Sequence, residues 1–510
     1  MKHLNRILNN QPKLKISGED MRRSLFTLLL IFIVANMLYS ELSFSGLNEF
    51  RYIYSNRLIE NRSYFSDKFQ LQAQINEFRA GVKYDLYYPK FGKFIIINDN
   101  MDDNAIELML ESEIDEYYFD EYYLQYESDY WFTQIGTYEA VIGSGIVLHN
   151  FYDDDFELDS RLIGGYINPV YDRWQLQLFG GFMESVDPNL EDEYDQLGAF
   201  DADVNITDKI TVGGSYVLHK ELLTNDVFNN RTIFAGKLNY ASSLFDLHTE
   251  YANSNNDEEV TGTAIYSNIT SYLGRFTLVG AYKYYENFNV RISDLPMVNH
   301  AGQILEHSWD PGKDEEGLMG EIRFLPNHEN EFVVNYAEGW NSNFKVRLSN
   351  LYTEFKHDFD EWSFKAEFET LEQLNKENAN RWFKEITPTL TFDFLVKNNP
   401  ILIKAEYQYK EEEKVTGNQS HFEPRFQTDV SIGNYSLSVA VENQIGESEA
   451  EEDGDDGEFW IGGELATTIF NNTDLRLFYG KEKGGVVCRN GVCKNQAEFE
   501  GIRLTLITTF

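Results

Sequence analysis

Short connections alternate with longer, more polar connections along the chain after residue 40, and this alternation is the strongest constraint on the fold. Eleven tight reversals occur, at residues 76–77, 127–129, 169–172, 207–208, 241–243, 273–274, 326–329, 357–360, 397–400, 433–434 and 471–473. Between them stand longer links, such as 90–116, 185–194, 219–228, 286–314, 373–380, 411–418, 446–457 and 483–495. In a soluble β-sandwich, nothing requires short and long connections to alternate in this way. A membrane-spanning antiparallel barrel does, because its turns are short at one end and its loops are long at the other.

Apolar and polar residues alternate most clearly in five segments between these connections, at residues 174–178, 362–369, 401–409, 435–442 and 475–479. A period of two is that of a β-strand with two different faces. In a barrel, the apolar face meets lipid and the polar face meets the water-filled lumen. The predicted lipid-facing residues include Trp362, Phe364, Phe368, Tyr407, Tyr435 and Leu437. The predicted lumen-facing residues are Lys365, Glu367, Glu369, Lys404, Glu406, Glu442, Asp474 and Arg476.

Both ends of the chain point to the same compartment. The last segment, residues 500–510, alternates apolar and polar residues and closes on Phe510. It resembles the C-terminal signature of bacterial outer-membrane barrels. Near the other end, Met21-Arg22-Arg23 precedes a short apolar run over residues 25–35, the pattern of a secretory signal peptide. We expect cleavage near Ser40; residues 1–20 are either a mis-called start or a long charged region before the apolar run.

Composition fits this reading. Aromatic residues make up 15% of the chain, with 32 Tyr and 38 Phe, which suits strands and interfacial girdles. Only 10 Pro interrupt 510 residues. The net charge of -41 argues against binding nucleic acid through its phosphates. We therefore predict an all-β protein, with residues 1–40 as a signal peptide and residues 41–510 as a single transmembrane antiparallel barrel of about 24 strands (roughly 22–26).

Cys488 and Cys493 flank an Asn490-Gly491 turn and are the only cysteines. Asn-Gly favours a two-residue hairpin, which would bring the two cysteines opposite each other at the lower limit of disulfide geometry. We predict a disulfide in an oxidising envelope. Two thiols alone supply only half of a tetrahedral zinc shell, and the spacing does not match a redox motif.

Two further stretches carry side chains that could do chemistry. An acidic run over residues 447–458 offers Asp453, Asp455, Asp456 and Glu458 as a weak candidate calcium site, although it lacks EF-hand spacing and reads more simply as a solvated outer loop. Gly136 to Leu148 contains Ser144 between two glycines, as in a nucleophile elbow, but no helix or matched His follows. A strand kink or a bend into the lumen is the better interpretation. The scattered histidines form no motif, so we expect no enzyme and no cofactor.

Four stretches together resemble an uncharacterised outer-membrane barrel family of Bacteroidetes-type bacteria, a domain of unknown function. They are residues 78–89, residues 136–148, Asp294-Leu295-Pro296 with Glu306-His307, and residues 484–510. The last of these, with its Gly-Gly pair, its two cysteines and its closing Phe strand, is the most specific. The resemblance implies a location and a fold, and it implies no activity.

These observations lead to a ranked expectation of function. The first is a porin-like channel for small polar or cationic solutes, in the bacterial outer membrane with both termini periplasmic. The alternative is a barrel-anchored receptor or adhesion surface that uses acidic extracellular loops; an outer-membrane hydrolase ranks third. The expected partners are outer-membrane lipid, the barrel-assembly machinery and a small solute or surface ligand, with no nucleic acid. The two longest links, 90–116 and 286–314, are the candidate constrictions of the lumen, which stays open unless loops fold inward.

Overall fold

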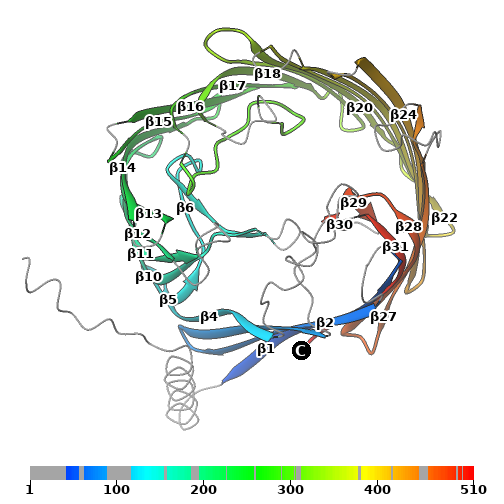
Figure 1. Ribbon diagram of the computed structural model, residues 1–510, viewed down its shortest axis with the longest axis horizontal. Coiled ribbons are helices and arrows are strands. Elements are labelled where there is room, and N and C mark those ends of the chain that lie inside the picture. Colours follow the sequence, from blue (N-terminus) through cyan, green and yellow to red (C-terminus); the bar gives the residue numbers. More distant parts are fainter. Residues whose placement is uncertain are drawn as a thin grey trace, which may run out of the picture.

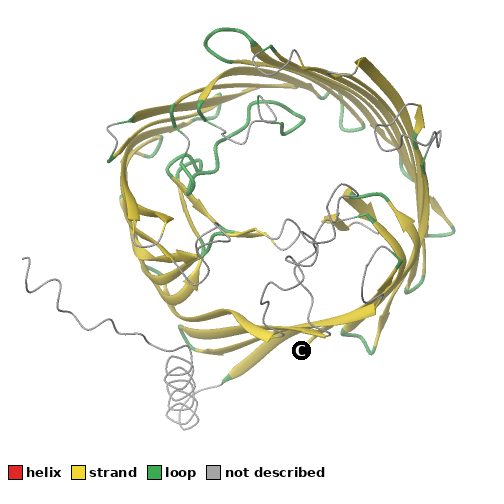
Figure 2. Cartoon of the chain, viewed as in Figure 1, coloured by secondary structure: helices red, strands yellow, loops and turns green. Residues whose placement is uncertain are grey.

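The computed structural model describes residues 42–510 except 57–62, 89–116, 154–157, 185–193, 225–226, 258–259, 289, 304, 306–311, 377–380, 415–416, 447–457, 490–491 and 497. The described residues form strands and no helix, and they close into a ring (Figure 1, Figure 2). Within these residues, no helix has the length and apolar character needed to cross a membrane. The predicted signal peptide lies outside them.

The wall of the ring is one antiparallel sheet. Its first half consists of β1 (Ser43–Ser55), β2 (Ser63–Ile75), β3 (Phe78–Tyr88), β4 (Tyr117–Ser128), β5 (Trp131–Tyr138), β10 (Leu162–Tyr171), β11 (Trp174–Glu184), β12 (Tyr194–Thr207), β13 (Ile210–Thr224), β14 (Val227–Ala241), β15 (Phe245–Asn256) and β16 (Thr261–Leu273). Its second half consists of β17 (Phe276–Glu286), β18 (Asp314–Phe324), β19 (Asn330–Trp340), β20 (Val346–Asp358), β21 (Trp362–Asn375), β22 (Arg381–Val396), β23 (Asn399–Lys414), β24 (Gly417–Ile432), β25 (Tyr435–Asn443), β27 (Phe459–Ile469), β28 (Thr473–Glu482) and β31 (Phe499–Thr509).

The sheet closes on itself because β1 pairs with both β2 and β31. It contains 25 strands, but β26 (Ile445–Gly446) only continues β25 along β24, so the wall is a closed barrel of 24 strands. The predicted fold class and strand number are therefore confirmed. The eleven predicted reversals all fall between wall strands, as at Gly433 and Asn434 between β24 and β25. Ser43 pairs with Gln74 beside the β2–β3 turn, which places the start of β1 at the short-turn end.

Two predicted long links are instead strand. β13 and β14 run on to Thr224 and Val227, and β23 and β24 run on to Lys414 and Gly417. The polar composition of residues 219–228 and 411–418 suggested loops. Backbone hydrogen bonds hold an antiparallel ladder whatever its side chains are, so a polar segment can continue a strand.

The outer face of the wall is apolar. The predicted lipid-facing residues Trp362, Phe368, Tyr407, Tyr435 and Leu437 are all exposed, and Phe364 is partly exposed. Leu437, Leu465, Leu477 and Leu504 lie in one cross-strand row over β25, β27, β28 and β31. Phe276 and Phe324 stack 4.5 Å apart close to the short turns, and Trp362 lies at the same end on β21. An aliphatic band with aromatic residues toward its border is the exterior of a membrane barrel.

The cysteine hairpin is a separate two-stranded sheet of β29 (Gly485–Arg489) and β30 (Val492–Gln496). Cys488 lies opposite Cys493 in its register, as the turn pattern predicts. The disulfide itself stays a prediction. It would close a loop from Cys488 to Cys493 only, so we expect it to stabilise the protein by about 2 kcal/mol or less.

Cys488→Ser should therefore leave the barrel folded. Mass spectrometry of protein isolated from an oxidising envelope should show no alkylatable thiol before reduction and two after it. Two free thiols in the unreduced protein would contradict the disulfide, and loss of the folded barrel in the variant would contradict its small contribution.

Candidate functional site: the partly filled lumen

A hairpin between β5 and β10 folds into the lumen. It consists of β6 (Ala140–Ile142) and β7 (Leu148–Asn150), and Figure 1 shows β6 inside the ring. Gly143 and Gly145 have φ values of 59° and 93°, and a backbone N–H of Gly145 donates to the carbonyl of Ile142 at 3.0 Å. Positive φ suits glycine, so the two glycines build the tight tip of this hairpin. The sequence predicted a kink or inward bend here, and the structure extends it to a whole inserted hairpin.

The tip of the hairpin is fastened to the wall by one carboxylate. Both the backbone N–H and the hydroxyl of Ser144 donate to Glu250 Oε2 on β15, at 2.9 and 2.7 Å. Glu250 is fully buried, and His248 Nε2 lies 3.6 Å from the same oxygen. A Cβ at position 143 would lie 2.5 Å from this carboxylate, so the glycine also makes room for it. Ser144 is thus an anchor, and its contact with a carboxylate is not that of a nucleophile with a His base.

A second inward segment, residues 287–303 between β17 and β18, packs against the hairpin. His149 N donates to the carbonyl of Ile292 at 2.8 Å, and Asp294 N donates to the carbonyl of Gly145 at 3.1 Å. The side chains of His149 and Asp294 also meet, with Nδ1 and Oδ2 2.9 Å apart. Link 286–314, one of the two candidate constrictions, therefore folds inward over its described residues. Link 90–116 lies outside the described residues.

Arg291 ties this segment to the wall. Its guanidinium lies 3.2 Å from Asp195 on β12 and donates to the carbonyl of Glu184 at 3.1 Å. Asp195 also contacts His219 Nε2 at 3.0 Å and accepts from the backbone N–H of Leu222. Asp195 and His219 are almost completely buried. A buried carboxylate left without its cationic partner is strongly destabilising, so Arg291 is part of the anchorage.

The same segment also reaches β20 and β21, through His300. The ring of His300 stacks on Tyr352 with 3.5 Å between centroids, and its Nδ1 lies 3.2 Å from Glu369 Oε1. Its backbone N–H donates to Asn350 Oδ1 at 3.0 Å. Four histidines thus take part in holding the inward segments: His149, His219, His248 and His300. The histidines showed no motif in the sequence because the carboxylate contacts of His149, His219 and His300 span 145, 24 and 69 positions. Only His248 has its carboxylate, Glu250, close by in the sequence.

An apolar core fills the space between the inward segments and β10 to β17. The hairpin contributes Ile142, Ile146, Val147 and Leu148, and the second segment contributes Phe288, Val290 and Ile292. The wall contributes inward-facing residues such as Phe179, Val217 and Ile233, all buried. This part of the barrel is therefore a packed interior, and the hydrophobic effect holds the hairpin there. We call the hairpin and residues 287–303 together the inner plug.

A cationic cluster holds the base of the hairpin near the start of β10. Arg161 lies 2.6 Å from Asp159 and 3.0 Å from Asp120, and Lys83 lies 2.6 Å from Asp120. The ring of Tyr152 lies between the two cations, at 4.1 Å from Lys83 Nζ and 4.2 Å from Arg161 Cζ. Burial lowers the pKa of Arg161, but the carboxylates raise it more, and the net direction is upward. The guanidinium therefore stays charged.

Most of the residues predicted for the lumen have polar or charged partners on the remaining wall strands. Lys365 and Glu367 form an ion pair at 2.9 Å on β21, and Lys404 and Glu406 form one at 2.8 Å on β23. Glu442 contacts Lys483 at 3.3 Å, and Asp474 accepts from the Thr468 hydroxyl. Arg476 lies in register between Ala466 and Thr505. Most of the acids therefore have a basic partner, which the sequence pattern did not reveal.

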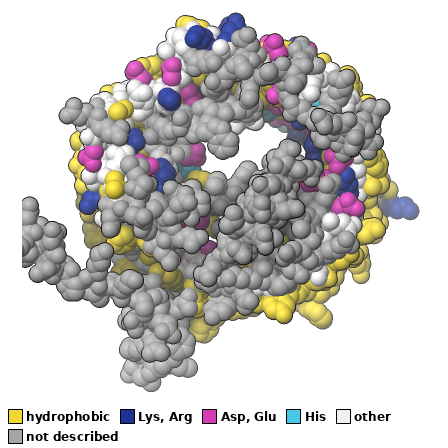
Figure 3. Space-filling view, in the orientation of Figure 1, with side chains coloured by type: hydrophobic (Ala, Val, Ile, Leu, Met, Phe, Trp, Pro, Cys, Tyr) yellow, Lys and Arg dark blue, Asp and Glu magenta, His cyan; other side chains and the backbone are white. Residues whose placement is uncertain are grey.

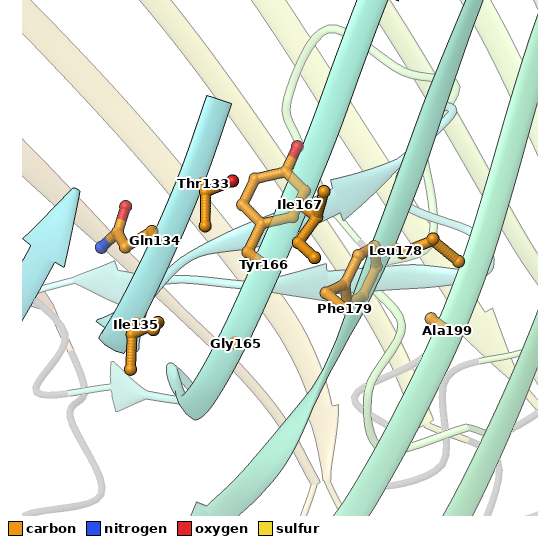
Figure 4. A pocket seen from close by; sticks show the side chains of 9 residues that line it. All are labelled: Thr133, Gln134, Ile135, Gly165, Tyr166, Ile167, Leu178, Phe179 and Ala199. Atoms are coloured by element: carbon orange, nitrogen blue, oxygen red, sulfur yellow. The ribbon is translucent and has the colours of Figure 1, made fainter. Parts of the chain in front are cut away.

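The remaining candidates have less support. Asp453, Asp455 and Asp456 lie outside the described residues, and Glu458 pairs with Lys481 at 2.5 Å. The described part of the chain holds no group of three or more His, Cys, Asp or Glu side chains arranged for a metal ion. An apolar depression of about 430 Å³ lies across β5, β10, β11 and β12 (Figure 4). Ile135, Ile167 and Leu178 line it and are exposed on the outer face.

The fold and the lumen together define a class: a closed 24-stranded antiparallel barrel with an inner plug built from its own loops. The chain belongs to DUF6029, a family of unknown function, whose model matches residues 54–380. The matched residues include three of the four stretches on which the family resemblance rested. The most specific one, residues 484–510, lies beyond them. No curated protein matches the chain.

Solved barrels of similar fold share little sequence with this chain. One is the E. coli P pilus tip assembly intermediate PapC-PapD-PapK-PapG, with a TM-score of 0.53 and 8% identity over 92% of this chain. The chain spans 60% of the length of that matched chain. The P pilus usher (PapC) translocation pore has a TM-score of 0.44 at 8% identity, covering 92% of this chain and 99% of its own. Pseudomonas aeruginosa OccK8 (OprE) has a TM-score of 0.38 at 12% identity, covering 65% and 94%. At these identities the first likeness shows the fold alone.

Proposed function

We propose that this protein is a porin-like channel for small polar or cationic solutes in the outer membrane of a Gram-negative bacterium. The observation that carries the proposal is an opening that the described residues leave through the barrel beside the inner plug (Figure 3). Charged side chains are visible on its inner rim, whereas apolar side chains cover the outside of the ring. A polar passage inside an apolar exterior is the architecture of a diffusion channel.

The proposed orientation places the short turns, the start of β1 and Phe510 in the periplasm. Residues 1–40 would serve as the cleaved signal peptide, and the barrel-assembly machinery would insert the mature chain into lipid. Contacts with the wall account for Ser144, the residue that most resembled a nucleophile, which favours a channel over a hydrolase.

The channel should prefer cations modestly. Among the eight predicted lumen residues, five are acids and three are bases, and the ion pairs of Glu367 with Lys365 and of Glu406 with Lys404 leave this small acidic excess in place. We therefore expect a reversal potential of cationic sign in a KCl gradient that shrinks as salt rises, because the Debye length falls from ~10 Å at 0.1 M to ~3 Å at 1 M.

The variant Glu367→Gln with Glu406→Gln should weaken this preference. Asp208→Asn, in the exposed turn between β12 and β13, serves as the control and should change it little. Anion selectivity at low salt would contradict the charge argument, and a complete lack of conductance would favour a receptor or adhesion role.

A further inference from the structure

Charged residues of the open wall are sorted into rows that run across the strands. Lys356 on β20 lies directly opposite Lys365 on β21, and Thr391 on β22 stands between Lys365 and Lys404 on β23. Two residues farther from the short turns, Glu354 lies opposite Glu367, and Thr389 stands between Glu367 and Glu406. We call the first set, Lys356, Lys365 and Lys404, the basic row. We call the second set, Glu354, Glu367 and Glu406, the acidic row.

Both rows face the open lumen. On β20 they share a face with Asn350, which contacts the inner plug through His300, and with Leu348, which packs against Leu305 just beyond it. The lysine side chains remain accessible, with exposed fractions of 39% for Lys356, 36% for Lys365 and 35% for Lys404. Figure 1 places β20 to β24 beside the opening, and Figure 3 shows Lys, Arg, Asp and Glu side chains on the rim there.

The rows place like charges directly opposite each other on neighbouring strands, which is destabilising. The carboxylates of Glu354 and Glu367 are close enough to share one partner. The hydroxyl of Tyr352 lies 2.7 Å from Glu354 Oε2 and 3.0 Å from Glu367 Oε1. A single hydroxyl proton can be donated to only one of the two carboxylates. A wall that needed only stability and water contact would alternate the signs across strands as well as along them. A local arrangement that opposes stability is typical of a functional surface.

The two rows are also in close contact along β21 and β23, whereas on β20 Lys356 pairs with Asp358 at 2.9 Å. Lys365 Nζ lies 2.9 Å from Glu367 Oε1, and Lys404 Nζ lies 2.8 Å from Glu406 Oε2. A lone cation drawn to the acidic row is repelled by the lysines beside it. A lone anion drawn to the basic row is likewise repelled by the glutamates beside it. A solute that carries both charges a few bonds apart gains from both rows at once. Thr389 and Thr391 add hydroxyls between the charged positions.

We propose that the basic and acidic rows form a binding surface for small zwitterions, such as α-amino acids, on their way through the channel. The ammonium group contacts the acidic row, and the carboxylate contacts the basic row. This inference rests on the proposed channel function and names its preferred class of solute. It adds a specificity that net charge alone does not give.

Liposome swelling with two solutes of similar size tests the proposal. L-alanine is the zwitterionic probe and lactamide is its uncharged counterpart. Vesicles that contain the full-length barrel should admit alanine a few-fold faster than lactamide. Lys356→Gln with Lys365→Gln, and separately Glu354→Gln with Glu367→Gln, should each bring the ratio close to one without slowing lactamide. Asp208→Asn with Lys209→Gln removes two exposed charges in the turn between β12 and β13, outside the rows, and should leave the ratio unchanged.

The outcomes separate this inference from the channel proposal. If lactamide enters but alanine enters no faster, the channel stands and the zwitterion surface is wrong. If the row variants and the control variant lower the ratio equally, the rows carry no special role and the inference is also wrong. If neither solute enters vesicles that contain folded protein, the channel proposal fails and this inference fails with it.

Discussion

Replacing residues 139–161 with a four-residue Gly-Ser link should raise the conductance of the barrel by roughly twofold or more, because a wall of this size encloses a lumen wide enough to need plugging. Tyr138 and Leu162 are cross-strand partners on β5 and β10, so a short link can join them without disturbing the wall. The deletion removes the inserted hairpin and with it half of the inner plug. Single-channel recording of the folded variant measures the effect.

A single substitution tests the same point with less risk that a conductance change reflects general loss of structure. Glu250→Ala removes the acceptor for both hydrogen bonds from Ser144, so the hairpin should detach intermittently and the current should fluctuate between two levels. Glu331→Ala, which lies outside the plug contacts, should conduct as the unmodified protein does. An unchanged, steady conductance in both plug variants would show that the hairpin does not limit the passage.

Leu477→Arg should destabilise the folded barrel by about 2–4 kcal/mol in lipid vesicles, the expected cost of an arginine on the lipid face near the bilayer midplane. Leu477 is exposed and lies between Leu465 and Leu504 in the aliphatic row of the outer face. An arginine side chain at this position has no water around it. Its guanidinium must therefore thin the bilayer locally or extend to the membrane–water interface.

The matched control places the same residue on the lumen side. Thr387 lies on the inner face of β22, with its hydroxyl 3.2 Å from Glu385, so Thr387→Arg finds both water and a carboxylate. Its effect on the free energy of unfolding should be much smaller. Folding titrations in urea measure both values. Equal losses of stability would mean that the inner and outer faces have been assigned wrongly.

The wall was predictable from sequence because it depends on local patterns. The turn at Gly433 and Asn434 is read from two residues, and the faces of β25 follow from the alternation over 435–442. Register then follows, because a slip by one residue would move Leu437 from lipid to lumen. The pairing of the cysteine hairpin was predictable for the same reason, because the local Asn490-Gly491 turn sets its register.

The inner plug was predictable only in part, because it depends on contacts between distant residues. Ser144 and Glu250 are 106 positions apart, and His149 and Asp294 are 145 apart. The apolar residues at 142 and 146–148 read as a kinked strand with no sign of a separate layer. One signal was available: two glycines around a serine at the tip of an apolar run suggest close packing against a backbone or a side chain. The alternation of charge along β21 was visible, but its partners across the strands required the register.

Single-channel recording of the full-length protein in planar lipid bilayers tests the central claim most directly. The account predicts discrete conductance steps, because the passage beside the inner plug stays open while Glu250, Arg291 and His300 hold the plug to the wall. Correctly folded protein that inserts into the bilayer and yields no conductance steps would contradict it.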